Sequence, residues 1–384
     1  MKRNHLLLAA GLLVSGLAAC EPGDDGYVPW DAIGDLGDSG WEVPGDTTPP
    51  DVPVGDGLDT WGLDYDGDGW TPADGDCDDT EYAVNPGAYD DPDNDVDDDC
   101  DGTRDNPLTD CDCGSMPTLI EALDICDTRF IRGVTERGGF DPATAEGRGV
   151  RNHYGSPGNG LTMREGCAYT ILDTGRIEPT TGGVGDPDRQ TGTDFRNPSD
   201  ELLGNWCKFL PLGTEPDPAP SGGGGIIICD TQQLAVDFTA PTNAVGFSFD
   251  FVYVSSEYPE WVGEGYNDTF YAILNRPSTG ENINISFDDY GAEIEVDNAF
   301  FESPPVTDLS GTGYSDTCTN EDFSVTICGS STGWLRTSWE IEPGEQFSLT
   351  FSIHDEGDGV YDSMVILDNF QWSIDAVDPG TIII

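Results

Sequence analysis

Aspartate side chains at alternate positions are the residues of this sequence whose type and spacing best match a known chemistry. Asp64, Asp66 and Asp68 occupy positions one, three and five of a loop, and Gly69 follows at position six. Calcium-binding loops begin in this way, because alternate carboxylates converge on one cation and the glycine permits a sharp turn. Position twelve, where an EF-hand carries a bidentate glutamate, is Gly75. The loop is therefore not a complete EF-hand, and further ligands must come from other residues.

Carboxylates downstream of this loop are the candidates for those ligands. We expect the metal-binding set to consist of Asp64, Asp66, Asp68, Asp74, Asp76, Asp78, Asp79, Asp91, Asp93, Asp95 and Asp97. The last four begin a second aspartate ladder, which continues to Asp99 and closes with C-D-G at 100–102. The alternative is an acidic spacer that binds nothing specifically. Carboxylates crowded in this way repel one another strongly unless a cation lies between them, which favours the metal site.

The 11 cysteines indicate an exported protein with disulfide bonds. Without Cys20, 11 − 1 = 10 remain, and an even number is typical of disulfide pairing in an oxidising extracytoplasmic space. Local spacing favours Cys77 with Cys100 and Cys318 with Cys328. The sequence leaves open the pairing of Cys111, Cys113, Cys126, Cys167, Cys207 and Cys229.

The complete pattern over 64–102 resembles a bacterial repeat of the MopE metal-binding type. It reads D-Y-D-G-D-G-W, D-C-D-D, N-P-G-A-Y, D-N-D and D-D-C-D-G in order. One departure is that many copies of the repeat carry a third cysteine after P-G-A, where Asp90–Asp93 stand here. The family label implies copper. The side chains here offer hard oxygen ligands without histidine or methionine, so calcium is the better chemical match.

The N-terminus has the pattern of a targeting segment. A positively charged start precedes the apolar run Leu6–Ala19, which is shorter than the roughly 20 residues of a spanning helix. The run ends in L-A-A-C, which resembles the lipobox of bacterial lipoproteins. That resemblance implies a signal peptide over 1–19 and a palmitate-bearing, diacylated Cys20 that attaches the protein to the outer membrane or cell surface. The alternative is a secretory peptide that leaves Cys20 as a free thiol.

Composition divides the rest of the chain into three parts. Residues 20–62 are rich in Asp, Gly and Pro and predict a disordered acidic tether, 63–105 form the metal-binding motif, and 108–384 form a globular domain. Apolar spacing over 116–130 predicts one amphipathic helix.

Beyond that helix, alternating apolar residues separated by turns predict a mainly β fold, an antiparallel β-sandwich of the jelly-roll type. The expected strands are 168–172, 225–229, 234–238, 245–254, 269–274, 283–287, 324–327, 338–341, 347–354 and 363–368.

Two segments of this domain resemble the choice-of-anchor L domain of bacterial surface proteins. They are F-S-F-D-F-V-Y-V-S-S-E-Y-P-E-W-V-G-E-G-Y-N-D-T-F-Y-A-I-L at 247–274 and H-D-E-G-D-G-V-Y-D-S-M-V-I-L-D-N-F at 354–370. With T-I-L-D-T-G at 170–175, the resemblance extends over about 115–376. It implies attachment to the surface through an anchor, here the lipid on Cys20, and leaves the biochemical activity undefined.

Polar residues within these two segments predict a second metal site at the rim of the sandwich. They are Glu257, Asn267, Asp268, Asp355, Asp358 and Asp362. Carboxylate and amide oxygens beside strand ends suit structural calcium. The alternative is that their Asp-Gly and Asn-Asp steps form turns in which the side chains bond to the backbone.

Charge and missing motifs limit the function classes. The formal net charge is 15 − 74 = −59, so the chain would be repelled by nucleic acid and by anionic lipid surfaces. The sequence contains no H-E-x-x-H, and His354 at a strand end is better explained as a structural histidine than as a general base. We therefore expect a protein that is not an enzyme.

The expected function is that of a lipid-anchored surface protein that binds calcium structurally and serves in adhesion or recognition, with a glycan or a surface protein as ligand. The first alternative is a carbohydrate-binding or glycan-degrading surface protein, which would need exposed Trp261, Tyr266, Trp334 and Trp339 along one groove. The second alternative is sequestration of copper or calcium by 64–102.

Overall fold

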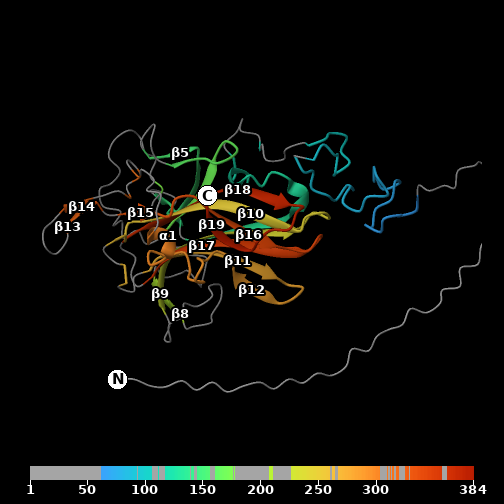
Figure 1. Ribbon diagram of the computed structural model, residues 1–384. Helices are drawn as coiled ribbons and strands as arrows, with labels where there is room; N and C mark the ends of the chain where they lie inside the picture. The colour runs from blue at the N-terminus through green and yellow to red at the C-terminus, as the bar shows by residue number, and fades with distance from the viewer. Residues whose placement is uncertain are drawn as a thin grey trace, which may run out of the picture. The chain divides into compact units, whose positions relative to one another are not determined.

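The computed structural model describes the chain from residue 62 onward, with gaps (Figure 1). The described residues are 62–92, 94–105, 111, 117–138, 140–141, 145–155, 161–175, 177, 207–210, 226–259, 262–263, 267–302, 309, 312, 314, 317–319, 325–327, 329–356 and 361–384. All of them belong to one compact unit, 59–384. The expected signal peptide, Cys20 and the tether lie outside the described residues.

Two antiparallel sheets pack face to face, which confirms the β-sandwich (Figure 1). One is six-stranded, with the order β1-β9-β17-β11-β12 and with β8 beside β9. Its strands are β1 (Ile131–Gly138), β8 (Cys207–Leu210), β9 (Ile226–Thr239), β11 (Thr269–Arg276), β12 (Glu281–Asn284) and β17 (Gln346–Glu356). The jelly-roll connectivity stays a prediction.

The second sheet is seven-stranded and has the order β19-β16-β10-β18-β7-β4, with β15 beside β10. Its strands are β4 (Arg148–Arg151), β7 (Tyr169–Asp173), β10 (Gly246–Ser255), β15 (Ser330–Ser331), β16 (Leu335–Glu340), β18 (Ser363–Ser373) and β19 (Gly380–Ile383).

Short elements complete the described part of the chain. Three small hairpins pair β2 (Phe140–Asp141) with β3 (Ala145–Glu146), β5 (His153–Tyr154) with β6 (Leu161–Thr162), and β13 (Thr317–Thr319) with β14 (Val325–Ile327). The helical segments are η3 (Glu121–Leu123), η4 (Thr128–Phe130) and α1 (Ala299–Glu302).

Period-two alternation places one row of large apolar residues from each central strand in the layer between the sheets. In β10, Phe247, Phe249, Phe251 and Tyr253 point into the layer between the sheets and are 0% exposed. The apolar residues of β17 from Phe347 to Ile353 alternate in the same way from the facing sheet. Because each such burial contributes about 1.5–3 kcal/mol, this layer is the main source of stability.

The prediction of an amphipathic helix over 116–130 was wrong. The described residues 117–130 contain only the 3₁₀ turns η3 and η4. Asp124 adopts a left-handed conformation, with φ 64°, and ends η3. A disulfide between Cys111 and Cys126 also fixes this stretch against the preceding chain. The apolar spacing nevertheless marked real core positions, since Leu123 is fully buried in the main core.

Residues 62–105, apart from Asp93, form turns rather than strands, and they contact the sandwich at the β9–β10 loop. Asn243 receives a hydrogen bond from the Tyr89 backbone N–H at 2.8 Å and donates one to the Tyr89 carbonyl at 2.8 Å. Thr242 donates through its hydroxyl to Asn85 at 2.7 Å. We call residues 62–105 the aspartate module below.

Candidate metal centre

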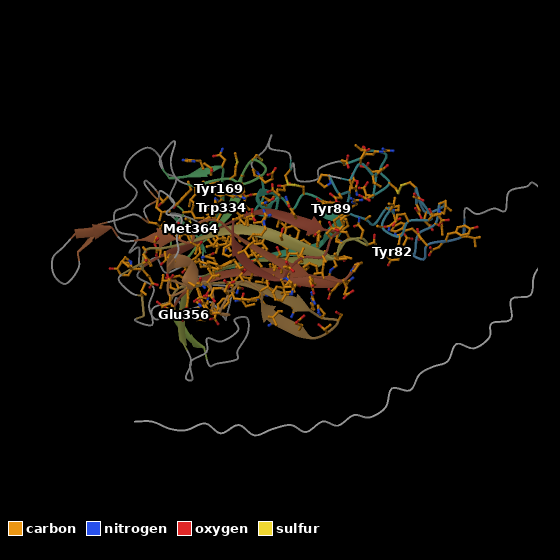
Figure 2. All side chains as sticks on the ribbon, viewed as in Figure 1. Tyr82, Tyr89, Tyr169, Trp334, Glu356 and Met364 are labelled. Atoms are coloured by element: carbon orange, nitrogen blue, oxygen red, sulfur yellow. A yellow bond between two sulfur atoms is a disulfide. The ribbon has the colours of Figure 1, made fainter. Side chains whose placement is uncertain are left out.

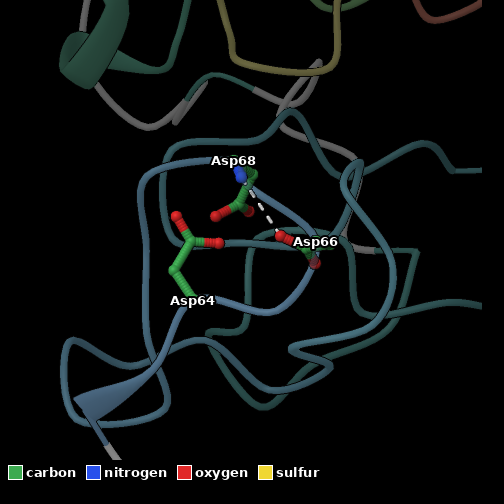
Figure 3. A group of neighbouring side chains, drawn as sticks. All are labelled: Asp64, Asp66 and Asp68. Atoms are coloured by element: carbon green, nitrogen blue, oxygen red, sulfur yellow. Dashed lines mark hydrogen bonds between the residues drawn. The ribbon is translucent and has the colours of Figure 1, made fainter.

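The first aspartate loop brings three carboxylates together, as the spacing predicted. Ligand atoms of Asp64, Asp66 and Asp68 all lie within 4.8 Å of one another, and Figure 3 shows the three side chains turned toward a common centre. Backbone N–H groups of the loop hold them: Gly69 N donates to Asp64 Oδ2 at 3.1 Å and Asp68 N donates to Asp66 Oδ1 at 3.1 Å. The loop is therefore folded around its own acidic side chains.

A second loop, made of Asp97, Asp99 and Asp101, has the same construction. Its ligand atoms also lie within 4.8 Å of one another. Gly102 N donates to Asp97 Oδ2 at 3.0 Å and Asp101 N donates to Asp99 Oδ1 at 3.1 Å, which repeats the pattern of the first loop position by position.

Backbone conformation matches between the two loops as well. Position four has a positive φ in each, 83° at Gly67 and 57° at Cys100, and position six has 96° at Gly69 and 94° at Gly102. Glycine tolerates this region of φ/ψ space, whereas a cysteine there is uncommon. Cys100 also forms a disulfide with Cys77, as its spacing predicted.

Asp76 adds a fourth carboxylate beside the first loop. It is 7% exposed, and its Oδ2 atom is buried without a hydrogen-bond partner. Burial raises its pKa, and the nearby charges of Asp68 and Asp66 raise it further. Gly75, at position twelve of the loop, has no side chain that could act as a ligand. Asp76, one residue later, places a carboxylate beside the loop instead.

Both loops contain buried carboxylate oxygens without a hydrogen-bond partner. Within the described residues, the buried oxygens without a hydrogen-bond partner include Asp66 Oδ2, Asp68 Oδ2 and Asp97 Oδ1. The pKa of Asp68 is raised by burial and by the charges of Asp66 and Asp64. Buried polar atoms in folded proteins are nearly always paired, so these oxygens are suited to bind a cation.

The second loop is also connected to the sandwich through a salt bridge. Arg129, in η4, donates through Nη2 to Asp99 Oδ2 at 2.8 Å and also contacts Asp127 at 2.6 Å. The Asp99 side chain is 3% exposed, and burial raises its pKa while Arg129 opposes that rise. One carboxylate of the second loop is therefore partly neutralised, which distinguishes it from the first loop.

Other aspartates expected in the module have partners outside the two groups. Asp74 and Asp78 accept from the hydroxyls of Thr71 and Thr80, each at 2.7 Å. The remaining members lie as follows: Asp79 accepts from Tyr65 N at 3.1 Å, Asp95 pairs with Arg104 at 3.6 Å, Asp91 N donates to Asp98 Oδ2 at 3.1 Å, and Asp93 lies outside the described residues.

Sequence reasoning did not assign Asp99 and Asp101 as ligands, although it placed them in or beside the second ladder. The signal was present, because D-D-D-C-D-G at 97–102 has the spacing of D-Y-D-G-D-G at 64–69. Reading the ladder from Asp91 instead of from Asp97 obscured the repeat.

The second set of candidates, at the sandwich rim, is only partly brought together. Glu257, Asp268, Asp355 and Asp362 are buried at the same end of the sandwich. Asn267 instead donates to Asp297 at 3.3 Å. Asp358 lies outside the described residues. A further carboxylate, Asp230 in β9, was not among the candidates, and it is a major influence on Asp355.

Among the residues that the structure describes, His354, Trp334 and Trp339 are packed into the sandwich and do not line an open groove. His354 is 0% exposed and stacks on Tyr271, with ring centroids 5.7 Å apart. Trp334 and Trp339 are half-buried and pack against the two core clusters. Trp261, Tyr266 and Cys328, the expected partner of Cys318, lie outside the described residues.

The disulfides Cys77–Cys100 and Cys111–Cys126 indicate an extracytoplasmic location. Within the described part of the chain, no helix has the length and apolar character needed to cross a membrane.

Comparisons with known proteins concern the sandwich. Among solved structures, the carbohydrate-binding module TmCBM61 in complex with β-1,4-galactotriose is 12% identical, with 50% of this chain and 96% of that chain covered and a TM-score of 0.19. The module CBM28, specific for non-crystalline cellulose, is 9% identical, with 40% and 77% covered and a TM-score of 0.18. Nothing about a ligand follows from scores this low. No curated protein matches the chain.

A family model does match. The Choice-of-anchor L domain covers residues 171–371, which is more than half of the 384 residues and includes both segments that carried the resemblance in the sequence. The chain therefore belongs to the Choice-of-anchor L domain family.

Proposed function

We propose that this protein is a lipid-anchored, non-enzymatic surface protein whose aspartate module binds calcium and thereby holds its sandwich ready for adhesion or recognition. The observation that carries the calcium proposal is the repeated loop. Two segments of one module adopt the same D-x-D-x-D-G conformation, each brings three carboxylates within 4.8 Å of one another, and each has a buried carboxylate oxygen without a hydrogen-bond partner.

Calcium suits these loops better than copper does. Asp64, Asp66, Asp68 and Asp76 offer only carboxylate oxygens, which are the ligands that calcium prefers. Copper is bound most tightly through imidazole or sulfur ligands, and the module's cysteines Cys77 and Cys100 are in a disulfide. Sequestration of copper by this module is therefore the weaker alternative.

Glycan binding remains the other alternative for the sandwich. It would require aromatic side chains exposed along one groove, whereas Trp334 and Trp339 are half-buried and contribute to core packing. No described feature favours a glycan over a surface protein as the ligand.

The calcium proposal is tested by comparing Asp68→Asn with Asp74→Asn in the mature chain. Asp68 has a buried, unpartnered oxygen in the first loop, whereas Asp74 is exposed and bonded to Thr71. Asp68→Asn should bind one calcium ion fewer per chain, measured by equilibrium dialysis and elemental analysis. It should also lose the stabilisation by calcium at that site, about 2.7 kcal/mol at a calcium concentration 100 times the Kd.

Asp74→Asn should keep the stoichiometry of the wild type, because its side chain lies outside both groups. A melting temperature that does not change when a chelator removes calcium from the wild type would overturn the proposal. So would equal calcium binding by Asp68→Asn and the wild type. Copper that displaces calcium at equal concentration would favour sequestration instead.

Attachment through lipid rests on the L-A-A-C pattern alone. Incorporation of labelled palmitate should depend on Cys20, so Cys20→Ser should abolish the label and release the protein from the membrane fraction. Continued labelling of that variant would refute the anchor.

A further inference from the structure

Two carboxylates continue the apolar rows of neighbouring strands into the interior of the sandwich. The alternation of β17 that buries Phe351 and Ile353 places Asp355 on the same inward face, and the alternation of β11 that buries Phe270 places Asp268 there. Asp268 and Asp355 are each 1% exposed. The interior of the sandwich therefore ends in an acidic layer at this end.

Strand register sets these two residues opposite each other. Phe270 pairs with Ile353 and Thr269 with His354, so one more step brings Asp268 beside Asp355. Directly opposed residues of antiparallel strands have Cβ atoms about 4.5–5.5 Å apart. Two like charges at that spacing, away from water, repel each other strongly.

A bulge in β9 adds a third carboxylate to this layer. β17 pairs Ile353 with Gln232 and Asp355 with Cys229, so Asp230 and Thr231 together stand opposite the single residue His354. Asp230 has φ 51°, an uncommon conformation for a residue with a side chain, and is 6% exposed. Bulges re-aim side chains, and here the charge of Asp230 acts on Asp355.

Asp362 adds a fourth carboxylate from the facing sheet, just before β18. It is 2% exposed, and its charge also acts on Asp355. Its carboxylate fills the space that a Cβ at Gly175 would occupy, so the backbone after β7 leaves room for it. Four acidic side chains, contributed by both sheets, are thus buried at this end of the sandwich, and the charges of the other three act on Asp355.

The oxygens of Asp355 are the ones without partners. Neither Oδ1 nor Oδ2 of this residue has a donor in hydrogen-bond geometry, although both are buried, and the nearby Thr174 side chain lowers the pKa of Asp355 without offsetting its burial. Asp268, in contrast, accepts from Ser363 Oγ at 2.5 Å and from Glu356 N at 3.2 Å. Burial raises the pKa of Asp355 well above its ordinary value, and the neighbouring acids raise it further. An ionised carboxylate here requires a counter-charge.

We propose that Asp355, together with Asp268, Asp362 and Asp230, binds a divalent cation of the calcium type between the two sheets. The donors are oxygen atoms, which selects a hard cation over a transition metal. This site is additional to the two loops of the aspartate module, which contact the other end of these strands. Asp355 lies nine residues along β17 from Gln346, which at the rise of a strand is about 30 Å.

Labelled residues in Figure 2 show the same separation: Glu356, next to Asp355, lies at one end of the sandwich, and Tyr89 of the aspartate module lies toward the other. The module loops and the site between the sheets are thus far enough apart to be tested independently.

Of the residues expected from sequence, Glu257 lies at the edge of this site. Its side chain accepts from Asp268 N at 3.4 Å, so it supports a ligand through the backbone. Asn267 points toward Asp297 and belongs to a different group of polar residues.

The test is the calcium stoichiometry of Asp355→Asn in the full chain, measured beside the wild type by elemental analysis after equilibrium dialysis. Asp355→Asn should bind one ion fewer, and the increase in melting temperature on adding calcium should shrink. The matched control is Asp288→Asn, because Asp288 is also buried, at 4% exposed, but accepts hydrogen bonds from its own turn. The Asp288→Asn variant should have a lower melting temperature than the wild type, by the same amount with calcium and with chelator. It should bind as many calcium ions as the wild type.

Two other counter-charges give different results. One is a proton shared between Asp355 and Asp268, and the other is a basic side chain of this protein. In either case Asp355→Asn would bind as many calcium ions as the wild type. That result overturns the proposal. If Asp355→Asn does not fold, as judged by near-UV circular dichroism, Asp362→Asn at the facing sheet provides the same measurement. Retention of the full stoichiometry by Asp362→Asn would then overturn it. Asp68→Asn reports separately on the module loops.

Discussion

Hydrogen-bond partners divide the buried aspartates of this chain into distinct kinds. Asp288 accepts from two backbone N–H groups of its own turn, at 2.8 and 2.9 Å, and thereby fixes that turn. Asp250 receives two bonds from Arg336, at 2.6 and 2.9 Å, and is neutralised by it. Asp355 has no such partner. Because an unpaired buried charge costs several kcal/mol, the last kind marks sites where an ion or a proton must be bound.

Asp124 and Asp368 form a pair that holds a proton. Burial, together with the charge of Asp368, raises the pKa of Asp124 to about 8. Burial likewise raises the pKa of Asp368, to about 6. Backbone N–H groups of Asn369 and Arg164 donate to the two carboxyls at 3.1 and 2.6 Å, so both side chains are fixed in place.

This pair predicts that stability falls as the pH rises. The folded state keeps a proton that the unfolded state, with an ordinary pKa of 3.8, releases. Stability from this group is therefore complete below about pH 4 and is lost progressively up to about pH 8. Asp124→Asn removes the titrating group and keeps an N–H donor, so its stability should decline less over this range than that of the wild type.

The measurement is the urea midpoint of both proteins between about pH 5 and pH 9, with calcium in excess so that the metal sites stay constant. Asp289→Asn, a substitution in an exposed turn, is the control and should follow the wild type. Parallel curves for Asp124→Asn and the wild type would show that the pair does not hold a proton.

At the scale of elements, the positions of strands were predictable because alternating apolar residues mark them. Whether two neighbouring strand segments form one continuous strand was not predictable. The segments 225–229 and 234–238 were expected as two strands, and the structure joins them in β9. The polar residues between them, including Asp230 and Gln232, read as a turn. In the fold they are the bulged part of one long strand, and tertiary pairing with β17 overrides their local preference.

The two aspartate loops were predictable to a similar degree. Spacing alone identified the first loop, because Asp64, Asp66 and Asp68 lie within a few residues of one another. Asp76 was among the candidates, but its burial depends on packing within the module. The opposition of Asp268 and Asp355 depends on register between distant strands, which no local pattern encodes.

Arg129 connects η4 of the sandwich domain to the second aspartate loop through Asp99, and removing Arg129 should weaken that connection. Arg129→Gln leaves Asp99 buried with one charged partner fewer, and should cost about 1–3 kcal/mol in free energy of unfolding. The cost should be larger with chelator than with calcium, since a bound cation would compensate the carboxylate charge that the variant leaves without its arginine.

Urea unfolding in calcium and in chelator measures this difference. Arg104→Gln is the matched control, because Arg104 pairs with Asp95 at 3.6 Å where both side chains are largely exposed, and such pairs contribute about 0–1 kcal/mol. If Arg129→Gln is no more destabilising than Arg104→Gln in either condition, the salt bridge to Asp99 does not hold the module to the sandwich.

At the scale of the whole molecule, the net charge of −59 is an unfavourable term for the folded state. Within 21–105, Arg104 is the one basic residue in a segment crowded with acids. In the sandwich, buried carboxylates such as Asp355 add to the repulsion. Divalent cations at the two loops and between the sheets would reduce this repulsion where it is strongest.

Monovalent salt should therefore stabilise the calcium-free protein more than the calcium-bound protein. Raising KCl from about 0.02 to about 0.5 M shortens the Debye length several-fold and screens repulsion between exposed carboxylates. With chelator present, the melting temperature should rise over this range. With calcium bound, the strongest repulsion is already offset, so the rise should be smaller. A neutral osmolyte at matched osmolality is the control, and it should act equally on both forms. Equal responses of the two forms to KCl would mean that the bound cations do not serve as the counter-charge of this chain.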